Sequence, residues 1–362
     1  MILNRNAMGL LLTSLMFGLV GCASGGSAIE ASQHTSTTYH SGGWNLVWRD
    51  EFDAPDIDVT RWEFEVNCFG GGNAEQQCYT DRADNAFVRN GILNIVAKSE
   101  RYSGPALQDD DANYDASDKS KTLPYTSARL RTAKKGDWQY GRFEIRAKLP
   151  QGQGTWPAIW MLPTDWVYGD WAASGEIDIM EAVNLKARSD REGAGADALE
   201  SRVYGTLHYG RNWPENVYSG QGYRLPNDLN PADDFHTYAI EWQAGEIRWY
   251  VDKVHYATQR SSGWYSQYMH DGQLITGDND APFNQVFHLI LNLAVGGAWA
   301  GNVNDTGIDG RVFPQAMLID YVRVYQCSIS PATGVGCGAI DESAPVVEGH
   351  QTPNLNGNAD DF

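Results

Sequence analysis

Short runs in which β-branched and aromatic residues alternate or cluster recur along most of this chain, and Gly and Asn punctuate them. Examples are Leu93–Ala97, Arg142–Ala147, Ile247–Val251 and Tyr321–Tyr325. Such runs are typical of strands, and no long stretch shows the period of a helix or a fixed repeat. The sequence therefore predicts an all-β fold. The body, residues 44–326, has the usual size of one large sandwich, so we expect one domain there rather than two.

One predicted strand, within Ser174–Val183, carries three carboxylates among apolar residues. Side chains two residues apart share a face of a strand, so Glu176 and Asp178 point to one side while the isoleucines between them point into a core. Glu181 breaks this alternation. One extra residue, accommodated as a β-bulge near Met180, would return Glu181 to the face of the other two acids.

A row of acids on one sheet face repels itself and serves folding poorly, whereas glycoside hydrolysis requires paired carboxylates. One carboxylate attacks the anomeric carbon and another protonates the departing oxygen. Retaining chemistry needs carboxyl groups roughly 5 to 5.5 Å apart, but five residues of straight strand span about 16 Å. The strand must therefore be bulged and curved. The alternative is a solvated acidic strand face without chemistry.

The stretch Glu176–Glu181 resembles the active-site strand of glycoside hydrolase family 16, in the bulged form of its laminarinase-like endo-β-1,3-glucanases. The lichenase-like and agarase-like branches have one residue fewer before the second Glu. Further stretches resemble the family in the same order: Gly141–Pro150, Trp156–Pro163, Gly205–Gly210, Phe235–Trp242 and Asp320–Tyr325. The resemblance covers roughly residues 44–326. It implies a β-sandwich jelly roll of two curved antiparallel sheets, as in concanavalin A-like lectins and glucanases.

The resemblance also implies roles for individual residues. Glu176 would be the nucleophile, Glu181 the acid/base, and Asp178 the residue that tunes the pair by sharing a proton. The implied substrate-binding residues are Trp156, Trp160, Trp171, Arg129, His208 and Asn73. Flat aromatic rings stack on the apolar faces of sugars. The alternatives are core packing for a tryptophan, a surface ion pair for Arg129 and a structural role for His208.

No cofactor is expected for catalysis, but the resemblance implies a structural Ca²⁺ site. Its ligands would be Glu51, the carbonyl of Gly91, and Asp320, which would join the first and last strands on the convex side. Hard oxygen ligands suit Ca²⁺. Such a site would stabilise the fold without joining the chemistry.

The chain has five cysteines, and two pairs of them have the same separation along the sequence. Disulfides Cys68–Cys78 and Cys327–Cys337 would each close a short loop after export, although other pairings and free thiols remain open. Zinc binding is disfavoured because no Cys-x-x-Cys or His-rich cluster accompanies them.

Residues 1–21 have the charged start and short apolar run of a lipoprotein signal peptide, followed by Cys22. We expect an exported bacterial lipoprotein, anchored in a membrane through acylated Cys22 and placed at the outer membrane or cell surface; ordinary secretion is the alternative. Residues 22–43, rich in Ser, Gly and Thr, are expected to form a flexible tether.

Residues 327–362 form a cysteine-containing tail whose part after Cys337 carries acidic residues without Lys or Arg, so we expect disorder there. The formal net charge of the chain is -19, which argues against nucleic acid and anionic polysaccharides as partners. The expected partner is a neutral β-glucan, and the protein is expected to be a monomer.

The sequence thus predicts a retaining endo-β-1,3-glucanase. Hydrolysis of mixed-linkage β-1,3-1,4-glucan or of a neutral galactan is the first alternative, and a non-catalytic glucan-binding module is the second. The bulged spacing between Glu176 and Glu181 favours the first function, and the presence of all three carboxylates argues against the binding module.

Overall fold

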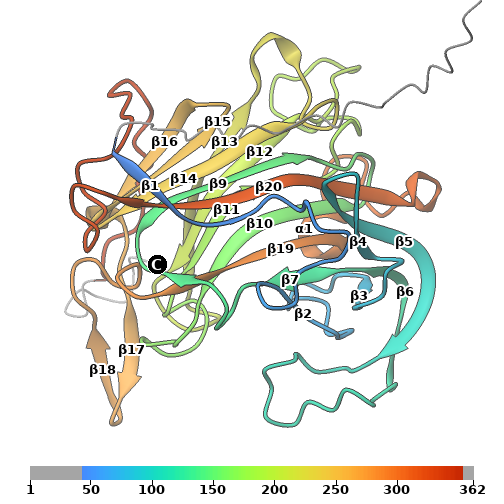
Figure 1. Ribbon diagram of the computed structural model, residues 1–362, viewed down its shortest axis with the longest axis horizontal. Coiled ribbons are helices and arrows are strands. Elements are labelled where there is room, and N and C mark those ends of the chain that lie inside the picture. Colours follow the sequence, from blue (N-terminus) through green and yellow to red (C-terminus); the bar gives the residue numbers. More distant parts are fainter. Residues whose placement is uncertain (1–42, 354–362) are drawn as a thin grey trace, which may run out of the picture. The chain divides into compact units, whose positions relative to one another are not determined.

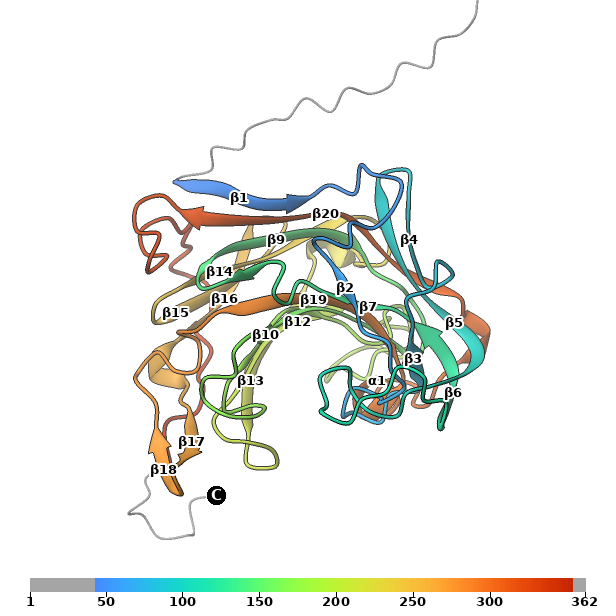
Figure 2. The same ribbon diagram turned by 60° about the horizontal axis from the view of Figure 1, so that its bottom comes forward.

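The predicted strands form two large sheets that stack face to face (Figures 1 and 2). The computed structural model describes residues 43–353, which lie within one unit spanning residues 40–362. The signal peptide, Cys22 and the tether lie outside the described residues. Within residues 43–353, no helix is both long enough and apolar enough to span a membrane.

The ten-stranded sheet, here called the outer sheet, has its strands in the order β16 (Val254–Arg260), β15 (Glu246–Val251), β14 (His236–Gln243), β9 (Gly141–Lys148), β20 (Gln315–Cys327), β5 (Ile92–Gly104), β6 (Lys121–Ser127) and β3 (Gln77–Tyr79). In addition, β1 (Trp44–Asp50) pairs with β20, and β4 (Ala86–Arg89) pairs with β5. Every pairing is antiparallel except that of β3 with β6.

The eight-stranded sheet, here called the inner sheet, has the order β13 (Val217–Arg224), β12 (Arg202–Tyr209), β11 (Glu176–Glu181), β10 (Thr155–Pro163), β19 (Phe287–Val295), β7 (Arg129–Arg131) and β2 (Glu63–Phe64), and β8 (Asp137–Trp138) also pairs with β19. Figure 2 shows that this sheet bends away from the outer sheet, so that its free face is concave.

The remaining elements are short. A separate hairpin consists of β17 (Gln267–His270) and β18 (Gln273–Thr276), and the helices are α1 (Gly297–Ala300), η1 (Pro226–Asp228), η2 (Ser261–Gly263) and η3 (Gly310–Val312). The all-β prediction is confirmed, and all four runs from which it was made lie within β5, β9, β15 and β20.

The core fills the space between the two sheets, because each strand of the stack turns one row of apolar side chains inward. Ile145 of β9, Ile177 of β11 and Leu289 of β19 are completely buried members of one cluster that draws on both sheets. Trp62, Trp242 and Trp249 are also buried in this cluster, and Trp48 packs against it. The disulfides Cys68–Cys78 and Cys327–Cys337 are both formed, as predicted.

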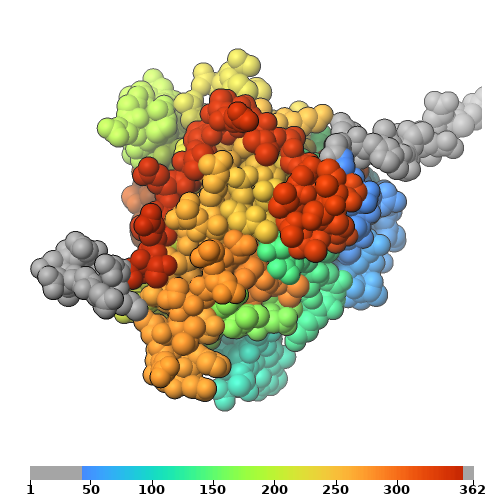
Figure 3. Space-filling view, turned by 90° about the vertical axis from the view of Figure 1, so that its left-hand side faces the viewer, coloured from blue at the N-terminus to red at the C-terminus, as the bar shows by residue number. Residues whose placement is uncertain are grey.

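The tail is ordered as far as residue 353, so the expectation of disorder after Cys337 is wrong for residues 338–353. Thr258 N of β16 donates to the carbonyl of Pro345 (2.9 Å), and Val347 N donates back to Thr258 O (2.7 Å). The segment, red in Figure 3, lies across the face built by the later strands. Composition misled the prediction because Val347 packs against the core and the backbone of the segment bonds to groups on the strands, including the side chain of Glu241. Residues 354–362 lie outside the described residues.

Candidate active site

The acidic strand β11 lies near the middle of the inner sheet and contains the predicted bulge. On β10, Trp160 pairs with Asp178 but the neighbouring Ile159 pairs with Met180, so one residue of β11 is extra. The pairing with β12 shifts at the same place, between Asp178 and Glu181. The bulge therefore interrupts the alternation where the sequence required it to do so.

The core holds this strand in its irregular form. Ile177, Ile179 and Met180 are all buried in the apolar cluster between the sheets, so the two residues of the bulge both face inward. Trp249, which comes from β15 of the outer sheet, donates its indole N–H to the carbonyl of Asp178 (2.8 Å). An added Cβ at Gly205 would lie 2.3 Å from Trp249, so glycine is required there for this indole to reach β11.

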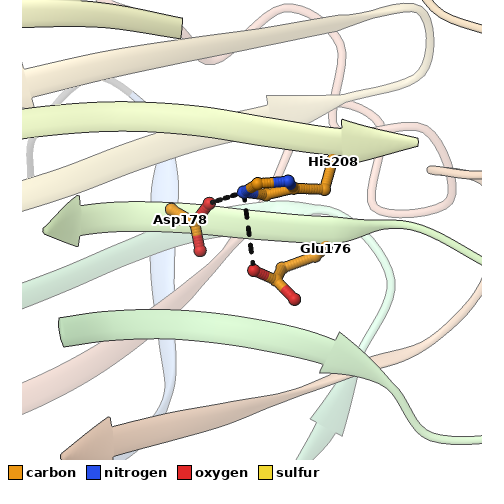
Figure 4. Close-up of side chains that lie close together, drawn as sticks. All are labelled: Glu176, Asp178 and His208. Atoms are coloured by element: carbon orange, nitrogen blue, oxygen red, sulfur yellow. Dashed lines mark ion pairs between the residues drawn. The ribbon is translucent and has the colours of Figure 1, made fainter. Parts of the chain in front are cut away.

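Glu176 lies at the start of β11 and directly opposite His208 of β12. Its Oε2 accepts a hydrogen bond from Trp171 Nε1 (2.7 Å), and its Oε1 lies 3.7 Å from His208 Nε2. The same His208 nitrogen lies 3.4 Å from Asp178 Oδ2, so the imidazole bridges the two carboxylates (Figure 4). Three residues that the sequence singled out are thus brought into one cluster with Trp171.

Glu181 lies at the other end of the bulge, and its Oε1 accepts a hydrogen bond from Trp156 Nε1 (2.9 Å). The ring of Trp156 meets that of Trp299 edge-on, with centroids 5.4 Å apart, and Tyr204 packs against Trp299 from β12. Trp156 is only 9% exposed. It therefore orients Glu181 and offers little open surface, whereas Trp299 and Tyr204 are site residues that sequence reasoning missed.

The proton affinities of these groups differ from those of isolated side chains. Burial and the charges of Glu181 and Glu176 raise the pKa of Asp178 well above its usual value. Burial also raises the pKa of Glu181 to about 7, with the nearby Glu176 and Glu75 adding to the effect. Burial lowers the pKa of His208, but the surrounding carboxylates outweigh it and raise that pKa to about 9.

Burial and like charges thus favour the protonated forms of Asp178 and Glu181, and the surrounding carboxylates favour the charged form of His208. A carboxylic acid that can give up a proton near pH 7 therefore lies on the same strand face as a second carboxyl group. This is the combination that general acid catalysis needs.

A chain of buried polar groups supports Trp160 on the concave face. Trp160 Nε1 donates to Asn292 Oδ1 (2.6 Å), Asn292 Nδ2 donates to the hydroxyl of Tyr79 (3.1 Å), and that hydroxyl donates to Glu75 Oε2 (3.3 Å). Gln77 also donates to this oxygen (2.6 Å). A signal for these groups was present in the sequence, because Asn292, like His288, is polar within the mostly apolar run of β19.

Arg129, on β7, and Asn73, in the loop before β3, contact the two ends of this hydrogen-bonded series. The guanidinium of Arg129 lies over the ring of Trp160, 4.6 Å from its centroid, and pairs with Glu65 (3.0 Å). Its contacts therefore fix Trp160 rather than the carboxylate of Glu176. Asn73 Nδ2 donates to Glu75 Oε1 (3.3 Å), and its carbonyl accepts from Ala298 N (2.7 Å), which ties the loop before β3 to α1.

The ligand set predicted for Ca²⁺ does not fit a cation as it is arranged. Strand pairing brings Glu51, Gly91 and Asp320 toward the same end of the outer sheet. However, both carboxylate oxygens of Glu51 accept hydrogen bonds from Arg323 (2.8 Å each), and Asp320 pairs with Arg146 (2.5 Å). Two guanidinium groups would have to leave before these acids could bind a metal.

A second group has metal-ligand spacing, since one ligand atom each of Glu176, Asp178 and His208 lie within 4.8 Å of one another. The imidazole points one nitrogen at both carboxylates, and its pKa is raised. The contacts are those of an imidazole that lies between two carboxylates.

Comparison with known proteins identifies close relatives of this chain. A sequence profile for "Glycosyl hydrolases family 16" matches residues 73–309. "Glucan endo-1,3-beta-glucosidase A1" of Niallia circulans is 38% identical over 305 residues, which are 82% of this chain and 40% of that protein. "Beta-glucanase" of Rhodothermus marinus is 41% identical over 322 residues, 86% of this chain and 93% of that protein.

The solved structure of the laminarinase from Rhodothermus marinus is similar as well, with a TM-score of 0.57 and 38% sequence identity. The likeness covers 78% of this chain and 98% of that one. The chain thus spans less than half of the first relative but nearly all of the second relative and of the solved laminarinase.

Proposed function

Because the chain belongs to glycosyl hydrolase family 16, we propose that it cleaves β-1,3-glucan internally and with retention of anomeric configuration. The observation that carries the proposal is the bulge in β11, which turns Glu176, Asp178 and Glu181 to the concave face of the inner sheet. Acids crowded in this way lower the stability of the fold. They can, however, act together on a glycosidic bond that lies between them.

In the first step, Glu176 attacks the anomeric carbon while Glu181 gives its proton to the departing glycosidic oxygen. Trp171 and His208 hold the Glu176 carboxylate in place. The raised pKa of Glu181, about 7, keeps a proton available near neutral pH. The C–O bond of the substrate breaks as a covalent ester to Glu176 forms, and the shortened chain leaves as an alcohol.

In the second step, Glu181, now ionised, takes a proton from a water molecule that attacks the same carbon and displaces Glu176. The sugar undergoes two inversions, and its configuration is therefore retained. Asp178, whose pKa is raised well above its usual value by burial and by the charges of Glu181 and Glu176, lies between the two glutamates and can share a proton with Glu176 as charge builds up and disappears. Only side chains and water take part in this scheme.

A neutral glucan fits the surroundings of these acids. Trp160 and Trp171 are half-buried aromatic residues near β11, and aromatic planes stack on the apolar faces of sugar rings. A protein that only bound glucan would gain nothing from three adjacent carboxylates, whose repulsion it would have to bear. These features favour hydrolysis over simple binding.

The substrate is tested by measuring reducing-sugar release from laminarin, barley mixed-linkage glucan, agarose and carrageenan. We expect the fastest release from laminarin. Preferential release from barley glucan or agarose would replace the proposed substrate, and no release from any polymer would contradict hydrolysis. Proton NMR of the first reducing ends formed should show the β anomer, and an initial α product would refute the two-step scheme.

We further propose that Cys22 is acylated and tethers the enzyme to a membrane after export, which is supported by the lipoprotein-like stretch before it. Replacing Cys22→Ser should move activity from the membrane fraction to the soluble fraction in a bacterial host. An unchanged distribution would count against the anchor. A monomer is expected for the released protein, which its sedimentation coefficient would establish.

A further inference from the structure

The concave face of the inner sheet continues past the catalytic strand onto β12 and the edge strand β13. Tyr218 of β13 pairs directly with His208 of β12, and His208 pairs with Glu176. Residues paired across antiparallel strands lie on the same face of the sheet. Tyr218 therefore lies on the face that carries the carboxylates, on the far side of His208.

The rings of Trp171, His208 and Tyr218 form a continuous row along this direction. The centroids of Trp171 and His208 are 5.6 Å apart, and those of His208 and Tyr218 are 5.7 Å apart. The planes are tilted by 40° and 36°, so the row is neither edge-on nor flat. The row begins at the hydrogen-bond donor of Glu176 and ends at the edge of the sheet.

Tyr218 differs from the other members of the row because its side chain is open to solvent. The residue is 66% exposed, although a tyrosine ring usually buries most of its area. The next two positions of β13 on the same face are Gly220 and Gly222, which pair with Thr206 and Tyr204 and carry no side chain. An open aromatic ring thus adjoins two positions of β13 that carry no side chain and that lie beside Thr206 and the ring of Tyr204.

We propose that Tyr218 is a stacking platform for a sugar unit of the glucan that lies beyond the units at the cleaved bond. The inference rests on the proposed function and names a binding position that the catalytic scheme does not use. The occupant is one uncharged sugar ring of the same chain, because the aromatic row is continuous with the site. The nearest charged side chain along β13, Arg224, is already paired with Asp228 (2.8 Å).

The position of Tyr218 determines which substrates are long enough to contact it. It lies two strands away from β11, and neighbouring strands are about 4.8 Å apart, so the ring is roughly 10 Å to the side of the catalytic strand. A substrate long enough to reach β13 gains the contact, whereas the shortest chain that can be cleaved does not. Tyr218 should therefore set a preference for long chains without affecting the bond-breaking step.

The test compares wild type with Tyr218→Ala on a ladder of β-1,3-gluco-oligosaccharides, from the shortest one hydrolysed up to laminarin. We expect kcat/KM on the shortest substrate to stay unchanged and kcat/KM on long substrates to fall about tenfold, mainly through KM, since aromatic stacking contributes about this much. Tyr218→Phe should behave like wild type. Leu46→Ala, an exposed apolar residue of β1 in the outer sheet, is the matched control and should change neither value.

Equal losses on short and long substrates would assign Tyr218 a structural role and overturn the proposal, as would unchanged kinetics on every length. Failure of the proposed function gives a different result, because wild type would then cleave no oligosaccharide of the ladder. A change in unfolding temperature of Tyr218→Ala, measured alongside, identifies loss of folding.

Discussion

The carboxylates of the outer and inner sheets have opposite surroundings: those of the outer sheet are paired with cations, and those of the inner sheet face one another. In the outer sheet, Glu241 accepts hydrogen bonds from Arg142 (3.0 Å) and from the Tyr250 hydroxyl (2.8 Å), and Arg248 lies 3.4 Å away. Ala339 N of the tail adds a fourth contact (3.1 Å). This buried acid is compensated on all sides, so its charge contributes to the fold.

In the inner sheet the acids face one another. Glu176, Asp178 and Glu181 share a single cationic partner, His208, and the pKa values of Asp178 and Glu181 are raised. Carboxylates therefore stabilise the fold in the outer sheet and destabilise it in the inner sheet. Destabilised acids with raised pKa values are typical of reactive sites.

The largest expected effect is on catalysis at the inner sheet. Glu176→Gln should reduce kcat on laminarin by about 10³-fold or more, because the lost nucleophile acts only in the transition state. Glucan affinity and unfolding temperature should change little. Steady-state kinetics and binding measurements check this, and ordinary turnover by the variant would remove Glu176 from the mechanism.

The next effect concerns stability at the outer sheet. Arg248→Met should lower the free energy of unfolding by about 3 to 5 kcal/mol, because it breaks a buried ion pair and leaves Glu241 and Glu246 undercompensated. The activity of the folded fraction should persist. Urea denaturation measures the change, with Arg311→Met at an exposed ion pair as a control without measurable effect. A stability equal to wild type would contradict the assigned role of the outer acids.

Removing an acid from the inner sheet should have the opposite sign. The pKa of Glu181 is raised from 4.5 to about 7 on folding, so its stabilising contribution is complete below pH 4.5 and is lost as the pH rises through 7. Glu181→Gln has no proton to lose and should be more stable than wild type by about 3 kcal/mol at pH 8.

At pH 4 the advantage of Glu181→Gln should disappear. Glu51→Gln, directly after β1 of the outer sheet, loses the paired contact with Arg323; it is the contrasting variant and should be less stable than wild type at pH 8. Chemical denaturation at both pH values tests the pair of signs. A destabilised Glu181→Gln at pH 8 would mean that the inner acids support the fold after all.

The smallest effect is a shift of the pH profile. Because Glu181 must be protonated to act as the acid, kcat/KM should fall as the pH rises above about 7. Glu75 adds to the raised pKa of Glu181, so Glu75→Gln should move this limb to lower pH by a few tenths of a unit. The control is Glu63→Gln on β2, which removes a carboxylate paired with Arg131. This variant should leave the alkaline limb at the same pH. A shift of this limb to higher pH in Glu75→Gln would contradict the effect of Glu75 on the pKa of Glu181.

The sequence predicted those parts of the site that depend on residues close together along the chain. The alternation around Glu176 and the surplus residue before Glu181 suffice to place both acids on one face, because strand geometry is local. The same holds for the disulfides, each of which closes a short loop. Family resemblance added Trp171 and His208, which the structure brings to Glu176.

Contacts between distant segments could not be read in this way. Tyr79 and Asn292 are joined by a hydrogen bond across 213 positions of sequence, and neither residue alone indicates the other. The order of residues 338–353 depends on contacts with distant strands, such as those of Val347 with the backbone of β16 and of Ala339 N with Glu241, which the composition of the segment does not indicate. The predicted Ca²⁺ ligands illustrate the same limit, since the resemblance does not indicate that Glu51 and Asp320 pair with Arg323 and Arg146.

The indole of Trp249 reaches from the outer sheet to the carbonyl of Asp178, at the irregular point of the catalytic strand. This hydrogen bond therefore adds to the shared apolar core a direct polar link between the outer sheet and the strand that carries the catalytic acids. Stabilising substitutions in the outer sheet that move Trp249 would therefore also move the bulge of β11. Directed evolution of one sheet would have to be accompanied by changes in the other.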